Sequence, residues 1–474
     1  MAGLVVALIA LGTLAFGAVY PWGFLPLFAA AALIGIVGLS RRGLPRRMRS
    51  VAIAMLLLCA AMAAQLLPMP LSALERLSPH AVPILTSYSL TFTGAQAEGT
   101  APLSIDPRST QVALLAAGAL GLYLLGLPAL LNGHGVRRVP RALAVFAVPL
   151  ALFAIYSRES HNGLIYWFWQ PQDGGGANLA GPFVNRNHFA GWMLMGVCLL
   201  IGWLFGQVER AVPHGGGRRS RRVEWLSSPE ANGLLLTGGA ILVAAISLFW
   251  TLSRSAILGF AVAAAAFTWL VLRRRKLGTT RRATVLAVLA AVSLAGVAWR
   301  GPARLVTWFQ DETDLIGRLE AWRDGWAVVQ DFPIVGTGLN TYSTAMLFYQ
   351  KRNLEVHIAQ AHNDYLQLLA EGGLLVTIPA AIAVVLLARA ILRNLRAAER
   401  EARGYWIRAG AAVGLLAIAV QELFEFSLQI PVNALLFCTL AAIALTPVTM
   451  SQAAAMSRDT IQHPPKSSSR DPLS

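Results

Sequence analysis

Charged residues and cysteines are scarce in this sequence of 474 residues. Only 13% of the residues are charged, about half the share found in an average soluble domain. The length alone would suggest about three soluble domains, but so few charged residues cannot cover their surfaces. The three cysteines, Cys59, Cys198 and Cys438, each lie in an apolar run without metal-binding spacing. The sequence therefore excludes a multidomain soluble protein, a disordered chain and a disulfide-stapled scaffold.

Long apolar runs are what the sequence has instead, since 56% of its residues are hydrophobic. A bilayer core requires about 20 apolar residues for each helical crossing. Twelve runs approach this length: 4–19, 24–40, 51–67, 111–131, 142–156, 188–207, 232–251, 254–272, 283–299, 374–392, 407–424 and 429–447. The shortest of them is 142–156. We therefore predict an all-α polytopic membrane protein with about twelve transmembrane helices.

The net charge of +16 indicates how these helices are oriented. If the N-terminus is cytoplasmic, most of the 39 lysines and arginines fall on the cytoplasmic side, as the positive-inside rule requires. We therefore expect both termini to be cytoplasmic, and we expect no nucleic-acid partner despite the positive charge. The long segments 68–110, 157–187 and 300–363 then lie outside, where functional groups tend to sit on loops.

These patterns divide the chain into four parts. We expect nine transmembrane helices with two outer loops in 1–299, a large outer loop carrying the catalytic motifs in 300–373, three further helices in 374–449 and a disordered cytoplasmic tail in 450–474. Within the large loop, residues 314–331 predict an amphipathic helix suited to the membrane surface. Its apolar stripe consists of Leu315, Leu319, Trp322, Trp326 and Val329.

Two arginines near the predicted outer ends of helices are candidates for anion binding. Arg254 lies in Leu252-Ser253-Arg254-Ser255, which joins two spans with almost no loop. A guanidinium there is costly unless it pairs with an anion or faces a wet cavity, and snorkelling to the lipid headgroups is the alternative. Arg318 lies beside the apolar stripe of the amphipathic helix, and a solvated role is its alternative. We favour anion binding for both.

His362 is the candidate base. It begins the segment His362-Asn363-Asp364 ahead of the tenth predicted span, where Asn363 or Asp364 can cap a helix. An imidazole at the membrane–water boundary can accept a proton from a hydroxyl group near neutral pH. A hydrogen-bonded structural histidine is the alternative, but two arginines expected on the same face favour catalysis.

Further polar residues cluster at two other outer helix ends. Asn185, Arg186, Asn187 and His188 place four hydrogen-bonding side chains in one turn at the start of the sixth span, and we expect them to bind substrate. Glu425, near the outer end of the eleventh span, can orient an arginine, although a structural salt bridge explains it equally well.

We predict no metal and no cofactor. The acidic run Asp311, Glu312 and Asp314 is compatible with a divalent metal, but the helix dipole explains acidic residues at a helix N-terminus equally well. His357 and His362 are five positions apart, whereas two zinc ligands on one helix face are four apart.

Three of these motifs together resemble the O-antigen ligase and O-antigen polymerase superfamily of bacterial membrane glycosyltransferases. They are Arg254 in Leu-Ser-Arg-Ser, Arg318 in Gly-Arg-Leu-Glu-Ala-Trp and His362 in His-Asn-Asp-Tyr-Leu. The arrangement of spans around a large outer loop is similar as well, and 185–191 resembles a segment of exopolysaccharide members. The resemblance implies that Arg254 and Arg318 engage a lipid diphosphate and that His362 is needed for transfer.

The resemblance also implies substrates and a location. The donor would be a glycan linked to undecaprenyl diphosphate, the acceptor lipid A-core or another glycan, and the location the bacterial inner membrane with a periplasmic active site. We therefore predict a metal-independent, inverting glycosyltransferase of the O-antigen ligase type. A polymerase is the alternative, because both share the motifs. A transporter of lipid-linked glycans is less favoured, because the centres of the first nine spans have no ionisable residues.

Overall fold

The computed structural model describes most of the chain, namely residues 1–88, 99–131, 133–160, 162–171, 179–211, 228–274, 277–300, 313–352, 354–399 and 402–446. Within these ranges nearly all regular structure is helical, and the strands are the short antiparallel pair β1 (Pro68–Pro70) and β2 (Thr100–Pro102). The predicted tail 450–474 lies outside the described residues.

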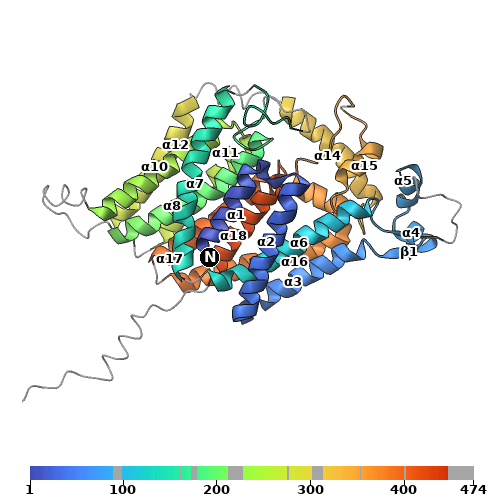
Figure 1. The fold of residues 1–474 in the computed structure, drawn as a ribbon, viewed down its shortest axis with the longest axis horizontal. Coiled ribbons are helices and arrows are strands. Elements are labelled where there is room, and N and C mark those ends of the chain that lie inside the picture. Colours follow the sequence, from blue (N-terminus) through green and yellow to red (C-terminus); the bar gives the residue numbers. More distant parts are fainter. Residues whose placement is uncertain are drawn as a thin grey trace, which may run out of the picture.

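Helices occupy all the apolar runs (Figure 1). They are α1 (Ala2–Leu14), α2 (Pro21–Arg42), α3 (Arg49–Ala64), α6 (Pro107–Leu130), α7 (Gly133–Ser160), α8 (Arg186–Ala211), α10 (Pro229–Trp250), α11 (Arg254–Arg273), α12 (Thr279–Arg300), α16 (Asp364–Ala398), α17 (Ala402–Gln421) and α18 (Pro431–Leu445). Among the described residues, nine helices are long and apolar enough to cross a membrane, while α1 and α18 are shorter apolar helices. The prediction of an all-α polytopic membrane protein is confirmed, and the number of crossings stays a prediction.

Two helices extend beyond the spans that hydropathy marked. Helix α7 begins at Gly133, ahead of the predicted 142–156, because arginines interrupt an apolar run without interrupting helical geometry. Helix α16 begins at Asp364 rather than 374 and is broken at Gly373, whose φ is 52°. Glycine accepts this left-handed conformation without the penalty that a Cβ atom brings. The predicted boundary between 300–373 and 374–449 coincides with this break.

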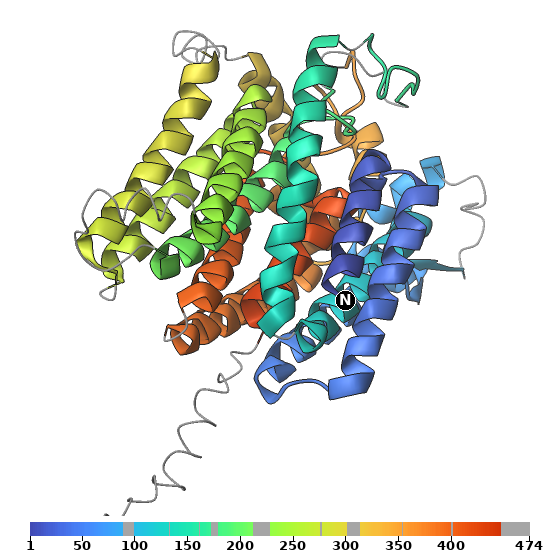
Figure 2. The same cartoon turned by 60° about the vertical axis from the view of Figure 1, so that its left-hand side comes forward.

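Close glycine contacts assemble the bundle. A Cβ atom on Gly202 of α8 would lie 2.3 Å from the carbonyl oxygen of Trp406 on α17, and one on Gly38 of α2 would lie 2.1 Å from that of Gly126 on α6. Larger residues would force each pair of helices apart. Figure 2 shows the resulting arrangement, with the N-terminal helices on one side of the bundle and α10 to α12 on the other. Helix α8 lies between them, and 94% of its apolar window is buried.

Two of the predicted outer loops fold together as one unit outside the bundle. Helices α4 (Leu71–Leu77) and α5 (Ala81–Tyr88) from the first loop share a core with α14 (Thr313–Asp331) and α15 (Tyr342–Tyr349) from the large loop. Gln65, fully buried after α3, holds this unit to α16. Its amide donates to the carbonyl oxygens of Val335 at 2.7 Å and Glu371 at 2.9 Å.

The predicted amphipathic helix is confirmed as α14, but its predicted stripe is mostly not part of the core. Leu315, Leu319 and Trp326 are 40%, 41% and 50% exposed. The face that packs against the protein instead contains Ala321 and Val328. Most of the stripe therefore forms an exposed apolar surface, as a helix on a membrane requires.

Candidate functional site

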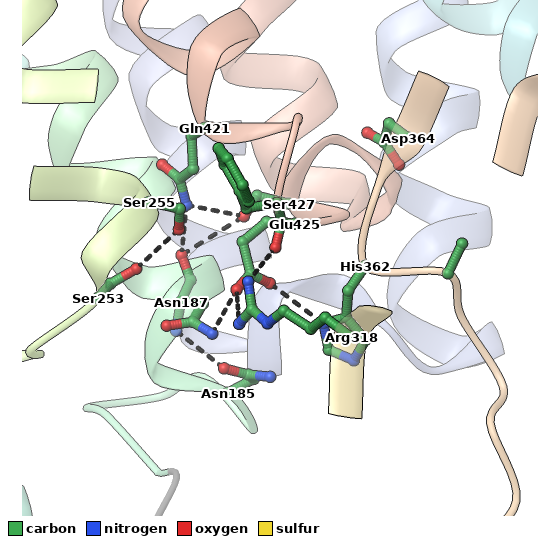
Figure 3. A network of polar contacts seen from close by, with 12 residues as sticks. Asn185, Asn187, Ser253, Ser255, Arg318, His362, Asp364, Gln421, Glu425 and Ser427 are labelled. Atoms are coloured by element: carbon green, nitrogen blue, oxygen red, sulfur yellow. Dashed lines mark hydrogen bonds and ion pairs between the residues drawn. The ribbon is translucent and has the colours of Figure 1, made fainter. Parts of the chain in front are cut away.

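The candidate site is built where several helices end on the same side of the bundle. Helix α8 begins there at Arg186 and α11 at Arg254, while α17 ends there at Gln421. Arg318 from α14 and the connection from Glu422 to Ile430 complete it. Figure 3 shows residues from all of these segments in one polar network.

A buried carboxylate, that of Glu425, is the centre of this network. Its Oε1 atom accepts hydrogen bonds from Nη2 of Arg318 at 2.7 Å and from Nδ2 of Asn187 at 2.6 Å. Its Oε2 atom lies 3.5 Å from Nδ1 of His362. The other terminal nitrogen of Arg318 donates to the carbonyl oxygen of Phe424. Three of the predicted site residues therefore converge on a fourth (Figure 3), which confirms that Glu425 contacts an arginine.

These contacts determine the charge of Glu425. Burial by itself raises the pKa of the Glu425 carboxyl group, but the hydrogen bond from His362 and the positive charge of Arg318 outweigh it. The net result is a pKa below the ordinary glutamate value of 4.5. Glu425 is therefore ionised at neutral pH and offsets the charge of Arg318 inside the protein.

His362 is held in a conformation that a non-glycine residue rarely adopts. Its φ is 49°, in the left-handed region, and its side chain is 35% exposed. Its ring meets the ring of Phe426 edge to face at 4.9 Å, and Phe426 also meets His188 at 4.5 Å. The contact of Nδ1 with Glu425 favours the tautomer with a proton on Nδ1, which leaves a lone pair on Nε2. The geometry thus supplies an oriented proton acceptor.

The two residues after His362 have separate structural partners. The side chain of Asn363 caps α16 by accepting from the backbone amides of Tyr365 at 3.1 Å and Leu366 at 3.0 Å, which settles the predicted cap. The carboxyl group of Asp364 accepts from the side-chain amide of Gln429 at 2.7 Å, and the backbone amide of Asp364 donates to the carbonyl oxygen of Glu422 at 3.1 Å. Burial and this neighbouring acid raise the pKa of Glu422 well above its ordinary value.

The turn that opens α8 contributes to the network and to its support. Asn185 caps the turn, since its side chain accepts from the backbone amide of Asn187 at 2.8 Å. Arg186 is half-buried as the first residue of α8. His188 is buried, and Asn433 from α18 donates to its carbonyl oxygen at 2.9 Å. Of these four predicted residues, only Asn187 has a side-chain contact with Glu425 among the contacts described.

Arg254 begins α11 directly after a tight turn. Leu252 in that turn has a φ of 56°, and the hydroxyl groups on either side of the arginine, from Ser253 and Ser255, lie 3.2 Å apart. Figure 3 places both serines beside Asn187, so α11 starts next to the network. Arg254 as a whole residue is half-buried.

A cavity of about 610 Å³ adjoins the network. Phe426 lines it and separates it from the two histidines. Its polar lining consists of Asn340, Gln360, Asp364, Gln367, Glu371 and Gln429. Much of the remaining lining is apolar and comes from α2, α6 and the start of α18. The side-chain amide of Gln367 bonds those of Gln360 at 2.6 Å and Gln429 at 3.3 Å, so hydrogen-bonding groups are already in position.

The structure describes only part of the acidic run that is compatible with a divalent metal. In the ranges that the structure describes, no group of three or more His, Cys, Asp or Glu side chains could hold a metal ion. Asp311 and Glu312 lie outside the described residues, as does the side chain of Asp314. Chemistry without a metal stays a prediction.

Sequence reasoning missed Phe426, Glu422 and Gln429. Each follows α17 within the short segment that contains Glu425. The sequence feature that could have indicated Glu422 and Gln429 is the density of polar residues beside an apolar span. Phe426 gave no signal, because a phenylalanine near a membrane helix is ordinarily a packing residue.

A known protein family matches a segment of the chain that contains part of this site. Residues 239–381 match the family model described as O-antigen ligase. That segment contains Arg254, Arg318 and His362, whereas Asn187 and Glu425 lie outside it. No curated protein matches the sequence. The match confirms the resemblance drawn from the motifs over residues 239–381: this segment of a multi-pass membrane protein is similar to the O-antigen ligase family, a likeness that indicates a glycosyltransferase-like enzyme.

Proposed function

We propose that this protein transfers a glycan from undecaprenyl diphosphate to a hydroxyl group of lipid A-core at the periplasmic face of the bacterial inner membrane. The observation that carries the proposal is the convergence of Arg318, Asn187 and His362 on Glu425. It supports the proposal because it brings the proposed proton acceptor, His362, and the proposed phosphate-binding side chain, Arg318, to one buried carboxylate.

His362 acts as the general base in this proposal. Glu425 holds the imidazole through Nδ1, so Nε2 accepts the proton of the acceptor hydroxyl group. The hydroxyl oxygen then attacks the anomeric carbon of the donor sugar while the bond from that carbon to the diphosphate oxygen breaks. Such a single displacement inverts the anomeric centre, and a positioned base of this kind contributes about 10²–10⁴ in rate.

Arginines stabilise the departing diphosphate. A guanidinium group has five N–H donors, and Arg318 uses two of its nitrogen atoms on Glu425 and Phe424, which fixes the plane of the group. The Arg318 guanidinium, together with Arg254 and Arg186, binds phosphate oxygens. Arginine suits this role because its fork binds phosphate in a bidentate manner and keeps its charge. No metal is required in this scheme.

The cavity beside Phe426 is the proposed site for the sugar units. Its amide and carboxyl groups suit the hydroxyl groups of an uncharged glycan, and its apolar lining suits the lipid chain or the sugar-ring faces. Asn185, His188 and Asn363 support the surrounding helix ends in this scheme. Asp364 contacts the glycan.

The proposed orientation follows from the charges at the opposite ends of the bundle. Helices α8 and α11 begin at the network, and their last turns at the other end contain Arg210 and Arg273. The positive-inside rule makes that end cytoplasmic and the network periplasmic.

Two experiments test the function and its alternatives. In vesicles containing purified protein, lipid-linked donor and lipid A-core, we expect a covalent glycan–lipid A product, whereas a transporter yields none. In a deletion strain, loss of all glycan chains from lipid A indicates a ligase. Lipid A that carries single-repeat caps indicates the alternative, a polymerase with a glycan acceptor.

A further inference from the structure

A second cavity, of about 950 Å³, lies between α7, α8 and α10 at the other end of the bundle. Helix α8 connects the two ends, because Asn187 contacts Glu425 near its start and Arg210 lines this cavity near its end. At 1.5 Å per residue, these positions are about 35 Å apart along the helix. The cavity therefore cannot belong to the site around Glu425.

The lining of this cavity combines positive charge with apolar surface. Four arginines line it: Arg137, Arg138, Arg141 and Arg210. Glu230 is the one acidic residue in the lining, so the cavity is strongly positive on balance. Further along the same helices, the lining consists of Val145 and Val148 on α7 and Leu236 and Ala240 on α10.

The apolar part of the lining is open to the surroundings of the bundle. Val145 is 72% exposed and Leu236 is 69% exposed, although both lie within apolar helices. Side chains of this kind on the outside of a membrane protein contact hydrocarbon chains. The cavity therefore opens toward lipid along one part and presents arginines at one end.

We propose that this cavity binds an anionic phospholipid of the membrane. Its phosphate group lies among Arg138, Arg141 and Arg210, and one acyl chain follows the groove along Val145 and Leu236. Arginine forks bind phosphate oxygens in a bidentate manner, and basic pockets between transmembrane helices on the cytoplasmic side are known to suit anionic headgroups. The positive-inside rule alone explains arginines at helix ends, but it does not require them to share a cavity with an exposed apolar groove.

The proposal can be tested by lipid binding to the full-length protein, without any activity measurement. Delipidated protein in neutral detergent is titrated with phosphatidylglycerol or with phosphatidylcholine of identical acyl chains, and bound lipid is counted by native mass spectrometry. We expect one tightly held phosphatidylglycerol and no equivalent phosphatidylcholine. The double variant Arg138→Gln/Arg141→Gln should weaken that binding about 30-fold, since each arginine near an anionic headgroup contributes about fivefold.

A matched control separates the cavity from general surface charge. Arg41→Gln/Arg42→Gln removes two exposed arginines from the end of α2, outside the cavity, and should leave the tight binding unchanged. Equal losses in the two double variants would overturn the proposal. If the first double variant does not fold, the single variants should each lose about fivefold, and unchanged affinity in both would also overturn it.

Competition identifies the ligand class. Glycerol 3-phosphate, which has the phosphate but no acyl chains, should not displace the lipid at millimolar concentration. Displacement would mean that a free anion suffices and would overturn the proposal. Tighter binding of undecaprenyl phosphate than of phosphatidylglycerol, lost in Arg138→Gln/Arg141→Gln, would replace the phospholipid by the carrier lipid and would equally overturn it.

Discussion

Nη2 of Arg318 lies 2.7 Å from Oε1 of Glu425, although the two residues are 107 positions apart in the sequence. The arginine comes from α14 and the glutamate from the connection between α17 and α18. The pair therefore ties a loop outside the bundle to the end of a transmembrane helix. Because the same carboxylate also contacts Asn187 and His362, a change at Glu425 should affect several proposed functions together.

Replacing Glu425 by glutamine should reduce turnover by at least about 100-fold. The amide keeps the shape of the side chain but loses the charge that pairs with Arg318 and orients His362, and charged hydrogen bonds are about twice as strong as neutral ones. Initial rates with the lipid-linked donor measure the effect.

Glu422→Gln is the matched control, three residues earlier in the same connection. Glu422 is buried and its pKa is raised well above the ordinary glutamate value, which favours the neutral form that glutamine resembles. We expect its rate within about threefold of the wild type. Similar rates for both variants would remove Glu425 from the mechanism.

Stability should fall in acid because of Glu425. A carboxylate with a depressed pKa in the folded state binds protons less readily there than in the unfolded chain. Its contribution to the stability of the folded state is therefore complete above a pH of about 4.3, the pKa of a glutamate in the unfolded chain. That contribution is lost as the pH falls through the pKa of Glu425 in the folded state. The melting temperature of the wild type should fall more steeply between about pH 5 and pH 3 than that of Glu425→Gln. Parallel curves would show that Glu425 is not a stabilising anion.

His362→Ala should abolish turnover while donor binding persists, because the arginines bind the donor and the base acts in the transition state. Turnover and donor-binding assays on the folded, reconstituted variant measure both effects.

His357→Ala serves as the control, because His357 is exposed in the same loop and bonds to Ser343 at 2.9 Å. It should retain wild-type turnover. If His362→Ala turns over normally, His362 is not the base, and His188 or Asp364 becomes the next candidate. A joint loss of folding and donor affinity would indicate a structural histidine.

Arg254→Lys should impair transfer about 100-fold at normal abundance, although it keeps the charge. An ammonium group cannot reproduce a planar bidentate fork, and loss of one aligned donor to a developing anion costs 10²–10³ in rate. Rates at limiting donor are the measurement. Arg323→Lys, on the exposed side of α14, should be neutral. Full activity of the Arg254 variant would exclude it from the diphosphate site.

Turnover should survive a chelator, because arginines supply the charge stabilisation in the proposed mechanism. Rates are compared with and without EDTA in the reconstituted assay. Inactivation by EDTA with rescue by Mg²⁺ or Mn²⁺ would instead assign ligand roles to Asp311, Glu312 and Asp314.

The sequence by itself determined the helices and the ends at which the polar motifs lie. Apolar runs of bilayer length and a 3.6-residue period are local properties, so α8, α11 and α14 could be predicted from their own residues. The motifs around Arg254, Arg318 and His362 were equally local, which is why the family resemblance was visible without coordinates.

Only the tertiary structure decided which of these residues meet. That Arg318, Asn187 and His362 share one carboxylate depends on how α8, α14 and α17 pack, and no periodicity encodes contacts between segments that are far apart in the sequence. The same packing leaves most of the apolar stripe of α14 exposed and places Phe426 between two histidines. These outcomes depend on side-chain fit between helices, because hydrophobicity is nearly non-directional and specifies that a residue is apolar but not which partner it contacts.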